Sequence, residues 1–578
     1  MPVRPSLTPL GTLAHSIVAS LLGLAATGAA AATPGGSPVP VLEVSRPGET
    51  RLSQYLSTHF ASEITEVRAG AKEIVIRGRV QAQSAPAYLV EVPIHRALTD
   101  TNPFPWVGAI RPNRSGRFTL SVDRQGSENP GQSPHDRLFS RWAVMRQEAT
   151  GPVLLSHARY ADVVEPRWQL PVEKPRGRKG LGALSPDRPL RDIEDLGISA
   201  VTVNVVLGSF MRTLDGPGRT PFSVGGRTWF IDDAAVGPLD RTMEEAARHR
   251  LIVSAILLVQ QAAHSADRAY GRMVTHADAD PSGHFAMPAV NTPDGHEAYA
   301  AALEWLARRY CQPGSPHGRI HHWIVHNEVD AAWEWTNAGE KTALEYLDLY
   351  QRSLRTVHLI ARQYDVHAQA FISLTHFWTA RASPHCYPSR ELLELLLQFG
   401  RAEGDFDWAI AHHPYPEDLF NPRTWEDKSA QMSFDTPQIT FKNLEVLDAW
   451  VRQQRTLFQG KTRRTVHLTE QGPNSRDYTT NALQLQAAAM AYVWKKLERL
   501  DTIQVFHFHN WVDNRGEGGL RIGLRKFPDE PGDPLGRKPV WHVFRALDTP
   551  GQAQAIEFAK PLIGIQEWDE AQHKTPIR

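Results

Sequence analysis

The hydrophobic and polar positions of this chain follow two different periods, and the change falls near residue 171. After that point, short apolar runs alternate eight times with longer segments in which apolar residues recur every three or four positions. The runs cover residues 180–184, 200–207, 251–259, 320–328, 370–374, 406–411, 465–469 and 503–508. Apolar runs between amphipathic helices are typical of parallel strands that helices cover. The pattern therefore predicts an α/β region.

The segments between the runs have helical periodicity. Tyr299, Leu303, Leu306 and Tyr310 share one face of a predicted helix, and residues 347–361 repeat this spacing. Eight strand–helix units in about 370 residues fit a closed (β/α)₈ barrel, or TIM barrel, with enlarged loops. The alternative is an open doubly wound sheet, but no glycine-rich phosphate-binding loop follows the first run.

Residues 57–170 alternate apolar and polar positions with a period of two. Strand patterns at 73–80, 87–92, 116–122, 141–145 and 153–155 are separated by turns. Such short strands favour an antiparallel β-sandwich, so the predicted fold is a TIM barrel preceded by a sandwich domain. This domain contains no residue cluster with catalytic chemistry, and we expect it to be accessory.

Composition predicts the remaining boundaries. Residues 1–32 have a weakly basic start, an apolar run and an alanine-rich end, which is typical of a signal peptide. They predict a secreted or periplasmic protein; the alternative, a membrane anchor, would need a longer apolar run. We expect residues 33–56 to be a flexible tether, 171–179 a linker, 180–550 the barrel and 551–578 a C-terminal tail.

Charge and cysteine content narrow the classes of function. Lys plus Arg and Asp plus Glu both number 63, so the chain lacks the basic excess of a nucleic-acid binder. Cys311 and Cys386 fall at opposite ends of the predicted barrel. Those ends are about 17–20 Å apart, whereas a disulfide needs Cα atoms within roughly 7 Å. We therefore expect two unpaired, buried and inert thiols.

Polar side chains at the ends of the predicted strands carry the chemistry, because TIM barrels place their functional groups there. Glu328 ends the fourth strand and Glu470 ends the seventh, and these strands face each other across the barrel. Two acids beside one space suit glycosidic cleavage, since one protonates the departing oxygen and the other attacks or positions water. A separation of about 5–5.5 Å gives retention of configuration, and about 6.5–9.5 Å gives inversion.

Four strand ends occur in an order that narrows the interpretation. They are Asn327-Glu328 at the fourth strand, His413-Pro-Tyr415 at the sixth, Glu470 at the seventh and Trp511 after the eighth. This series resembles clan A of the glycoside hydrolases, the retaining (β/α)₈ enzymes. Over residues 57–547 the chain also resembles a group of secreted bacterial proteins known mainly as a domain of unknown function.

The resemblance to clan A implies a role for each matching residue. Glu328 would be the general acid/base, and Glu470 would be the nucleophile that forms a glycosyl-enzyme ester. Asn327 would bind the hydroxyl next to the reacting carbon. Tyr415 would hydrogen-bond Glu470, and Trp511 would form the floor of the subsite for the distorted ring. For this mechanism Glu328 must hold a proton while Glu470 stays ionised.

Other polar and aromatic residues are weaker predictions for sugar contact. His326 stands where many clan members carry Trp or Gly, and we predict it, with His413 and His509, as a substrate-binding residue. Trp residues at 333, 335, 378 and 425 lie on loops, where they either stack on sugars or pack against the protein. We expect Asp330 to be solvated or paired with a basic neighbour.

Two other functions stay open at this point. The first is a metal-dependent hydrolase, because histidines are numerous near the strand ends; against it, no ligand ends the first strand. The second is a glycan-binding barrel without catalysis. We expect no metal or other cofactor and a carbohydrate substrate as partner. The sugar, its linkage, endo or exo action, the role of the sandwich and the oligomeric state stay open.

Overall fold

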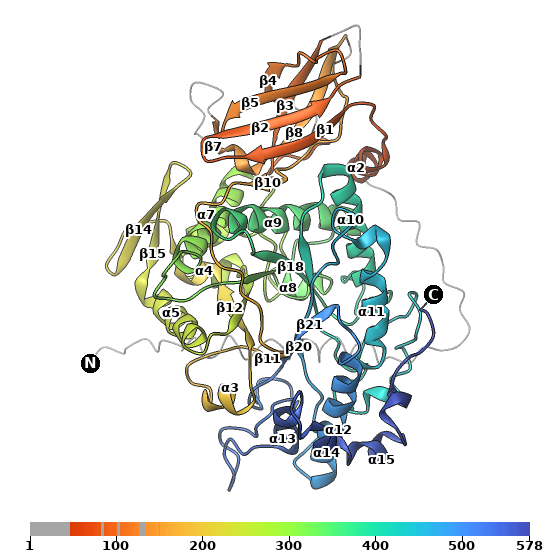
Figure 1. Cartoon of the computed structure of the whole chain (residues 1–578). Helices are drawn as coiled ribbons and strands as arrows, with labels where there is room; N and C mark the ends of the chain where they lie inside the picture. Colours follow the sequence, from red (N-terminus) through yellow and green to blue (C-terminus); the bar gives the residue numbers. More distant parts are fainter. Residues whose placement is uncertain (1–46, 82–85, 101–103, 127–134, 150, 578) are drawn as a thin grey trace.

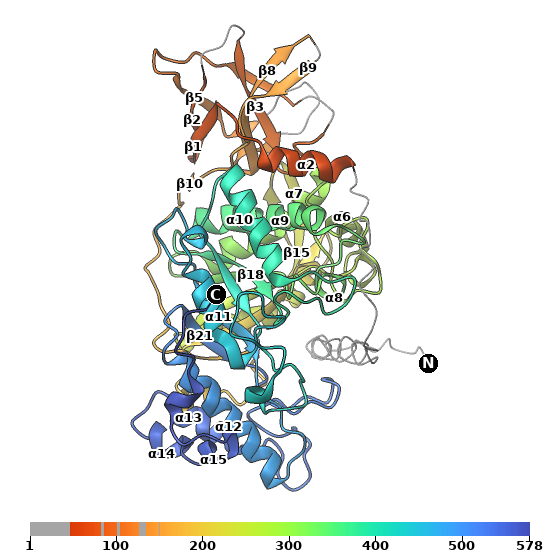
Figure 2. The same cartoon turned by 90° about the vertical axis from the view of Figure 1, so that its right-hand side faces the viewer.

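The computed structural model describes residues 47–81, 86–100, 104–126, 135–149 and 151–577. Figures 1 and 2 show a β-sandwich at one end of an elongated molecule, the barrel in the middle and the C-terminal helices at the other end. The predicted signal peptide and the first part of the predicted tether lie outside the described residues.

Eight parallel strands close into a barrel. In order around the ring they are β11 (Lys179–Leu181), β12 (Ala200–Val206), β16 (Ile252–Leu258), β17 (His322–Val325), β18 (Gln369–Leu374), β19 (Trp408–His412), β20 (Val466–Gln471) and β21 (Ile503–Phe508). The first strand, β11, pairs in parallel with both β12 and β21, which closes the ring. All eight apolar runs form these strands, so the predicted TIM barrel is confirmed.

Helices cover the outside of the barrel (Figure 1). The main ones are α5 (Asp233–Arg248), α7 (Pro293–Tyr310), α9 (Ala343–Tyr364), α10 (Ser389–Glu403), α11 (Leu444–Val451), α12 (Thr480–Leu497) and α13 (Pro539–Ala546). The longest of them, α9, begins with a reciprocal capping box between Thr342 and Glu345. Such a box satisfies two backbone donors that a helix start leaves unpaired. The apolar face of α9 packs on the strands, where Leu347 and Leu354 are fully buried.

The N-terminal domain is a sandwich of two four-stranded sheets, as predicted. One sheet has the order β10 (Val163–Val164), β1 (Glu63–Ala69), β2 (Glu73–Arg79) and β5 (Arg117–Asp123). The other has the order β4 (Trp106–Ala109), β3 (Ala87–Pro93), β8 (Ser140–Glu148) and β9 (Gly151–Leu154). Among the described residues of these two sheets, the short pair β1–β10 is parallel and the other strand pairs are antiparallel.

The sandwich rests on the helical side of the barrel. Leu359 of α9 belongs to the sandwich's own apolar core. A buried ion pair joins Nη1 of Arg141 on β8 to Oε1 of Glu403 at the end of α10, at 2.9 Å. Tyr55 donates its hydroxyl to the same carboxylate oxygen at 3.2 Å. The two domains therefore share apolar and charged contacts.

Two segments differ from their predictions. Residues 47–57, expected in part as tether, form the helix α2 (Pro47–Ser57), because Tyr55 and Leu56 are buried against the folded protein. The predicted tail contains α14 (Gln552–Ile556) and α15 (Ala559–Ile563), and α15 packs against α12. Both thiols are free and buried, as expected. In the part of the chain that the structure describes, no helix has the length and apolarity that a bilayer crossing requires.

Candidate active site

Two buried glutamates lie at the carboxyl ends of barrel strands that are three places apart in the ring. Glu470 belongs to β20, and Glu328 follows the end of β17. Their exposed fractions are 5% and 1%. Glu328 and the nearby His326 adopt positive φ angles of 37° and 65°. Backbone strain of this kind, on the order of 1–3 kcal/mol, persists only where the surroundings enforce it, and it clusters at functional sites.

His413 connects the surroundings of the two glutamates. Its Nδ1 lies 2.8 Å from Oε1 of Glu328, and its Nε2 lies 2.9 Å from Oγ1 of Thr469, the residue before Glu470. Burial lowers the pKa of the imidazole, while the charge of Glu470 acts in the opposite direction. A neutral ring has one donor and one acceptor nitrogen, so it fixes the Glu328 carboxyl relative to β20.

Tyr415 is a second group on which both carboxylates act. Its hydroxyl donates a hydrogen bond to Oε1 of Glu470 at 3.2 Å. Burial, followed by the charges of Glu470, Glu517 and Glu328, holds the pKa of this phenol well above its usual range. The hydroxyl therefore stays protonated and serves as a donor. The hydroxyl therefore contacts Glu470 directly and lies within electrostatic range of Glu328.

The surroundings of Glu328 favour its protonated form. Burial raises its pKa to about 8, while the Trp335 indole and the His509 imidazole act in the opposite direction. Trp335 ends the one-turn helix α8 (Ala332–Trp335). Among the described residues, Oε2 of Glu328 has no hydrogen-bond partner. At neutral pH this side chain is thus a buried acid with one oxygen available to a substrate.

A third buried carboxylate, Glu517, completes the site, and the strand-end patterns did not indicate it. It lies in the loop after β21, accepts a hydrogen bond from Nδ2 of Asn510 at 2.6 Å and is 1% exposed. Its Oε1 is 3.5 Å from Nε2 of His509. Burial lowers the pKa of His509, but Glu470 and Glu517 outweigh it, so the pKa is raised. The fold of this loop places Glu517 beside the strand ends, and the spacing of residues in the sequence does not predict that position.

Asn327 and His326 have different surroundings from each other. Asn327 is buried beside Glu328, and its Oδ1 has no partner among the described residues, as expected of a group awaiting a ligand. His326 is engaged elsewhere: its ring nitrogens lie 3.2 Å from the carbonyl oxygen of Leu257 and 2.8 Å from Oγ of Ser353 on α9. These contacts fix the ring between β16 and α9. Contact of His326 with a sugar stays a prediction that the structure does not favour.

The loop tryptophans separate into two groups. Trp335, Trp378 and Trp511 are almost fully buried, and the Trp511 indole donates to Oδ2 of Asp192 at 3.0 Å. Trp511 also belongs to the main apolar core, so its role as a subsite floor stays a prediction. Trp333 and Trp425 are only half-buried.

Asp330 is neither solvated nor paired with a cation, and that expectation was wrong. Its carboxylate is 2% exposed and accepts hydrogen bonds from the Thr375 backbone at 2.9 Å and the Ser389 hydroxyl at 2.9 Å. Burial raises its pKa to about 6. The loop after β18 supplies donors that the sequence near Asp330 does not contain.

The histidines considered as metal ligands are dispersed through the barrel. His321 contacts Glu173, and His412 lies 3.1 Å from the carbonyl oxygen of Ile439. His322 and His467 pack edge to face inside the barrel, with ring centroids 5.1 Å apart. Within the described ranges, no group of three or more His, Cys, Asp or Glu residues has an arrangement that could hold a metal ion.

Solved structures similar to this one are glycoside hydrolases. A family 39 glycoside hydrolase from the gut symbiont Bacteroides cellulosilyticus WH2 is 12% identical, with a TM-score of 0.42 over 85% of this chain and 83% of that chain. A β-D-glucuronidase from Dictyoglomus thermophilum is 13% identical, with a TM-score of 0.34 over 84% of this chain and 68% of that one. A family 1 β-glucosidase from Thermotoga maritima is 12% identical, with a TM-score of 0.39 over 67% and 99%.

No curated protein matches the chain. One family model matches residues 171–571, the barrel and the C-terminal helices, and its description is "Family of unknown function (DUF5722)". Since this match spans well over half of the chain, the protein belongs to the DUF5722 family.

Proposed function

We propose that this protein is a retaining glycoside hydrolase that cleaves O-glycosidic bonds of an oligo- or polysaccharide with Glu328 and Glu470. One observation carries the proposal. The carboxyl groups of Glu328 and Glu470 both act on the Tyr415 hydroxyl, and their surroundings differ: burial keeps a proton on Glu328, while Tyr415 donates a hydrogen bond to Glu470. Double displacement requires one carboxyl that holds a proton and a second carboxylate that attacks the sugar.

In the first step Glu470 attacks the anomeric carbon, and the bond from that carbon to the leaving oxygen breaks. Glu328 transfers its proton to the leaving oxygen, so the departing alcohol is neutral. The sugar becomes an ester of Glu470, and Glu328 becomes a carboxylate. His413, hydrogen-bonded to Oε1 of Glu328, holds this carboxyl in place while the other oxygen faces the leaving group.

In the second step the ionised Glu328 removes a proton from water, and the water oxygen attacks the anomeric carbon. The ester bond breaks and Glu470 leaves as a carboxylate, which the Tyr415 hydroxyl stabilises. Two displacements at one carbon restore its configuration. Asn327, with its free buried Oδ1, fits the role of a contact to the neighbouring hydroxyl.

The stereochemistry of the product tests the mechanism. Proton NMR of the first anomer released from an aryl glycoside should show the configuration of the substrate, and release of the opposite anomer would exclude Glu470 as a nucleophile. Glu470→Gly should be inactive in water but form a glycosyl azide of inverted configuration when azide is added. Glu328→Ala with azide should give the retained configuration.

We also propose that the protein acts outside the cytoplasm, on the basis of the N-terminal pattern of residues 1–32. N-terminal sequencing of the protein recovered from the periplasm or medium should find the chain beginning near residue 33. Recovery of full-length chain from the membrane fraction would favour an uncleaved anchor.

A further inference from the structure

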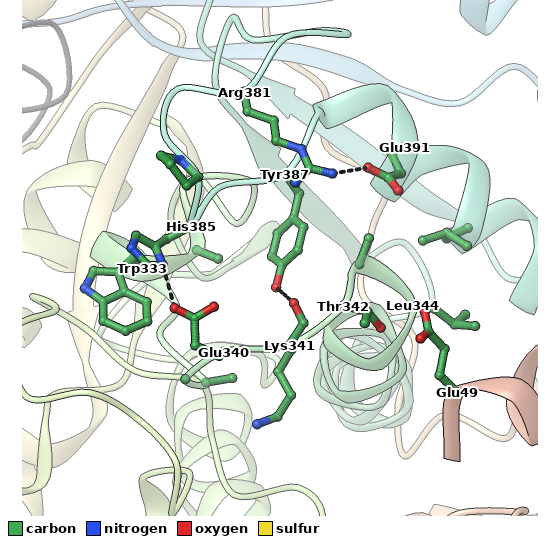
Figure 3. Close-up of a pocket in the computed structure, with 16 residues that line it drawn as sticks. Glu49, Trp333, Glu340, Lys341, Thr342, Leu344, Arg381, His385, Tyr387 and Glu391 are labelled. Atoms are coloured by element: carbon green, nitrogen blue, oxygen red, sulfur yellow. Dashed lines mark hydrogen bonds and ion pairs between the residues drawn. The ribbon is translucent and has the colours of Figure 1, made fainter. Parts of the chain in front are cut away.

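A cavity of about 260 Å³ lies beside the loops that follow β17 and β18, on the same face of the barrel as the two glutamates. Figure 3 shows Tyr387 in the middle of its lining, with Trp333 and Glu340 on one side and Thr342 and Glu49 on the other. Its size is just below the range of roughly 300–1,000 Å³ that holds drug-sized ligands. It therefore suits one sugar ring better than a large cofactor.

The helix α8 separates this cavity from the catalytic acid. Residues two positions apart on a helix point about 200° apart. The Trp335 indole favours the ionised form of Glu328, whereas the Trp333 side chain lines the cavity and is half-buried. The partition has the width of a helix with its side chains, about 10 Å. A sugar in the cavity would therefore lie beyond the ring that is next to Glu328.

The chemistry of the lining fits an uncharged ligand with many hydroxyls. Glu340 pairs with His385 at 2.7 Å, and Glu391 lies 3.8 Å from Arg381 (Figure 3). These four side chains are 41–66% exposed, so they offer donors and acceptors of nearly balanced charge to the cavity. Trp333, whose ring packs on that of His385 with centroids 4.6 Å apart, adds a flat ring on whose other face sugar C–H groups can stack.

The position of the cavity decides which part of a substrate reaches it. The general acid stands on the side of the leaving group, because it protonates the departing oxygen. Glu328 and α8 lie on this side, and Glu470 on β20 lies across the barrel. A chain of sugars that continues beyond the cleaved bond would therefore run past α8 toward Trp333.

We propose that this cavity, lined by Trp333, Arg381 and His385, is a remote subsite for a sugar on the leaving-group side. The inference rests on the proposed function and deepens it: the substrate is an oligo- or polysaccharide whose released part contains more than one sugar. Catalysis then depends on the length of the chain that leaves.

The test compares kcat/KM for an aryl glycoside with kcat/KM for oligosaccharides of increasing length, both made of the sugar that the wild-type enzyme cleaves. The ratio of kcat/KM for the long oligosaccharide to kcat/KM for the aryl glycoside should fall about tenfold in Trp333→Ala, because this variant lacks the stacking ring. Arg381→Ala, at an exposed position on the other wall, should lower the ratio in the same direction. Trp333→Phe should keep most of it.

The control is Trp106→Ala, which removes an exposed ring from the β-sandwich and should leave the ratio at its wild-type value. An unchanged ratio in both cavity variants, or a wild type that does not prefer longer chains, would overturn the inference. The proposed function would survive that result. It fails separately, if Glu470→Gln cleaves the aryl glycoside as well as the wild type does.

Discussion

One glutamate is buried at the mouth of the barrel, and another is buried at the interface between the barrel and the β-sandwich. The negative charge of the two carboxylates is neutralised in different ways. At the interface, Glu403 accepts hydrogen bonds from Arg141 at 2.9 Å and from Tyr55 at 3.2 Å. At the mouth, Glu328 is equally buried, but its only described side-chain hydrogen bond is to His413. A cation balances the first carboxylate, and a proton balances the second.

This difference separates a structural carboxylate from a functional one. In a buried ion pair the cation compensates the charge of the carboxylate. A buried carboxyl without a cation holds its proton at neutral pH, which makes it an acid for chemistry at the cost of stability. A buried glutamate can thus be structural or functional, depending on whether a cation or a proton balances its charge.

The largest expected effect concerns the proposed nucleophile. Glu470→Gln should lower kcat/KM by at least about 10⁴-fold, because the amide cannot form the glycosyl ester. Glu328→Gln should lower it by about 10²- to 10⁴-fold for substrates whose leaving group needs a proton. Glu403→Gln, assayed where it remains folded, should keep the activity of the wild type. Loss of activity in Glu403→Gln alone would contradict the comparison.

The two buried glutamates should have opposite effects on stability. Glu403→Gln leaves Arg141 buried without its partner, which should cost about 3–5 kcal/mol of unfolding free energy. Glu328 has a folded-state pKa of about 8 against an ordinary value of 4.5. Between those values the folded protein keeps a proton that the unfolded chain releases, so stability falls as pH rises.

Glu328→Gln removes this penalty and should stabilise the protein by roughly 2–4 kcal/mol at pH 8, with little effect near pH 4.5. Thermal unfolding followed by calorimetry at both pH values measures the change. Equal stabilisation at the two pH values would show that packing, rather than the proton, is responsible.

Activity should depend on the same proton. Because kcat/KM reports the ionisation of the free enzyme, it should fall tenfold per pH unit above about pH 8, where Glu328 loses its proton. The measurement is a kcat/KM profile across neutral and alkaline pH. A profile without an alkaline limb in this region would mean that another group supplies the proton.

A smaller effect is expected at the donor to the nucleophile. Tyr415→Phe removes a hydrogen bond to a carboxylate, worth about 1.5–3 kcal/mol, and should lower kcat by roughly 10- to 150-fold. Tyr270→Phe is a matched control, since this buried hydroxyl donates to the carbonyl oxygen of Ala298 in α7, within the helical layer. Equal losses in both variants would assign the effect of Tyr415 to folding.

Much of the fold and part of the site could be predicted from the sequence. The eight apolar runs predicted the barrel because a strand buried on both faces must be apolar along its whole length. Glu328, Glu470 and Tyr415 could be found because strand ends are marked by the change from apolar to polar residues. Asn327 and His413 could be found from the same change from apolar to polar residues at the strand ends.

Other features depend on contacts between distant segments. Glu517 reaches the site through the fold of a loop, and His326 turns toward α9 because its backbone has a positive φ angle. From the sequence, Asp330 was expected to be a surface acid. In the structure, the segment after β18 supplies hydroxyl donors to its carboxylate. The α2 helix forms in a segment that resembles a linker, because Tyr55 and Leu56 find a surface to cover.

By itself, the sequence determined the alternation of strands and helices and the positions of the two acids along the chain, since both follow from local periodicity. Only the tertiary structure decided which carboxylate holds a proton. That outcome depends on burial and on the nearest donors and charges, and those neighbours come from strands far apart in the chain.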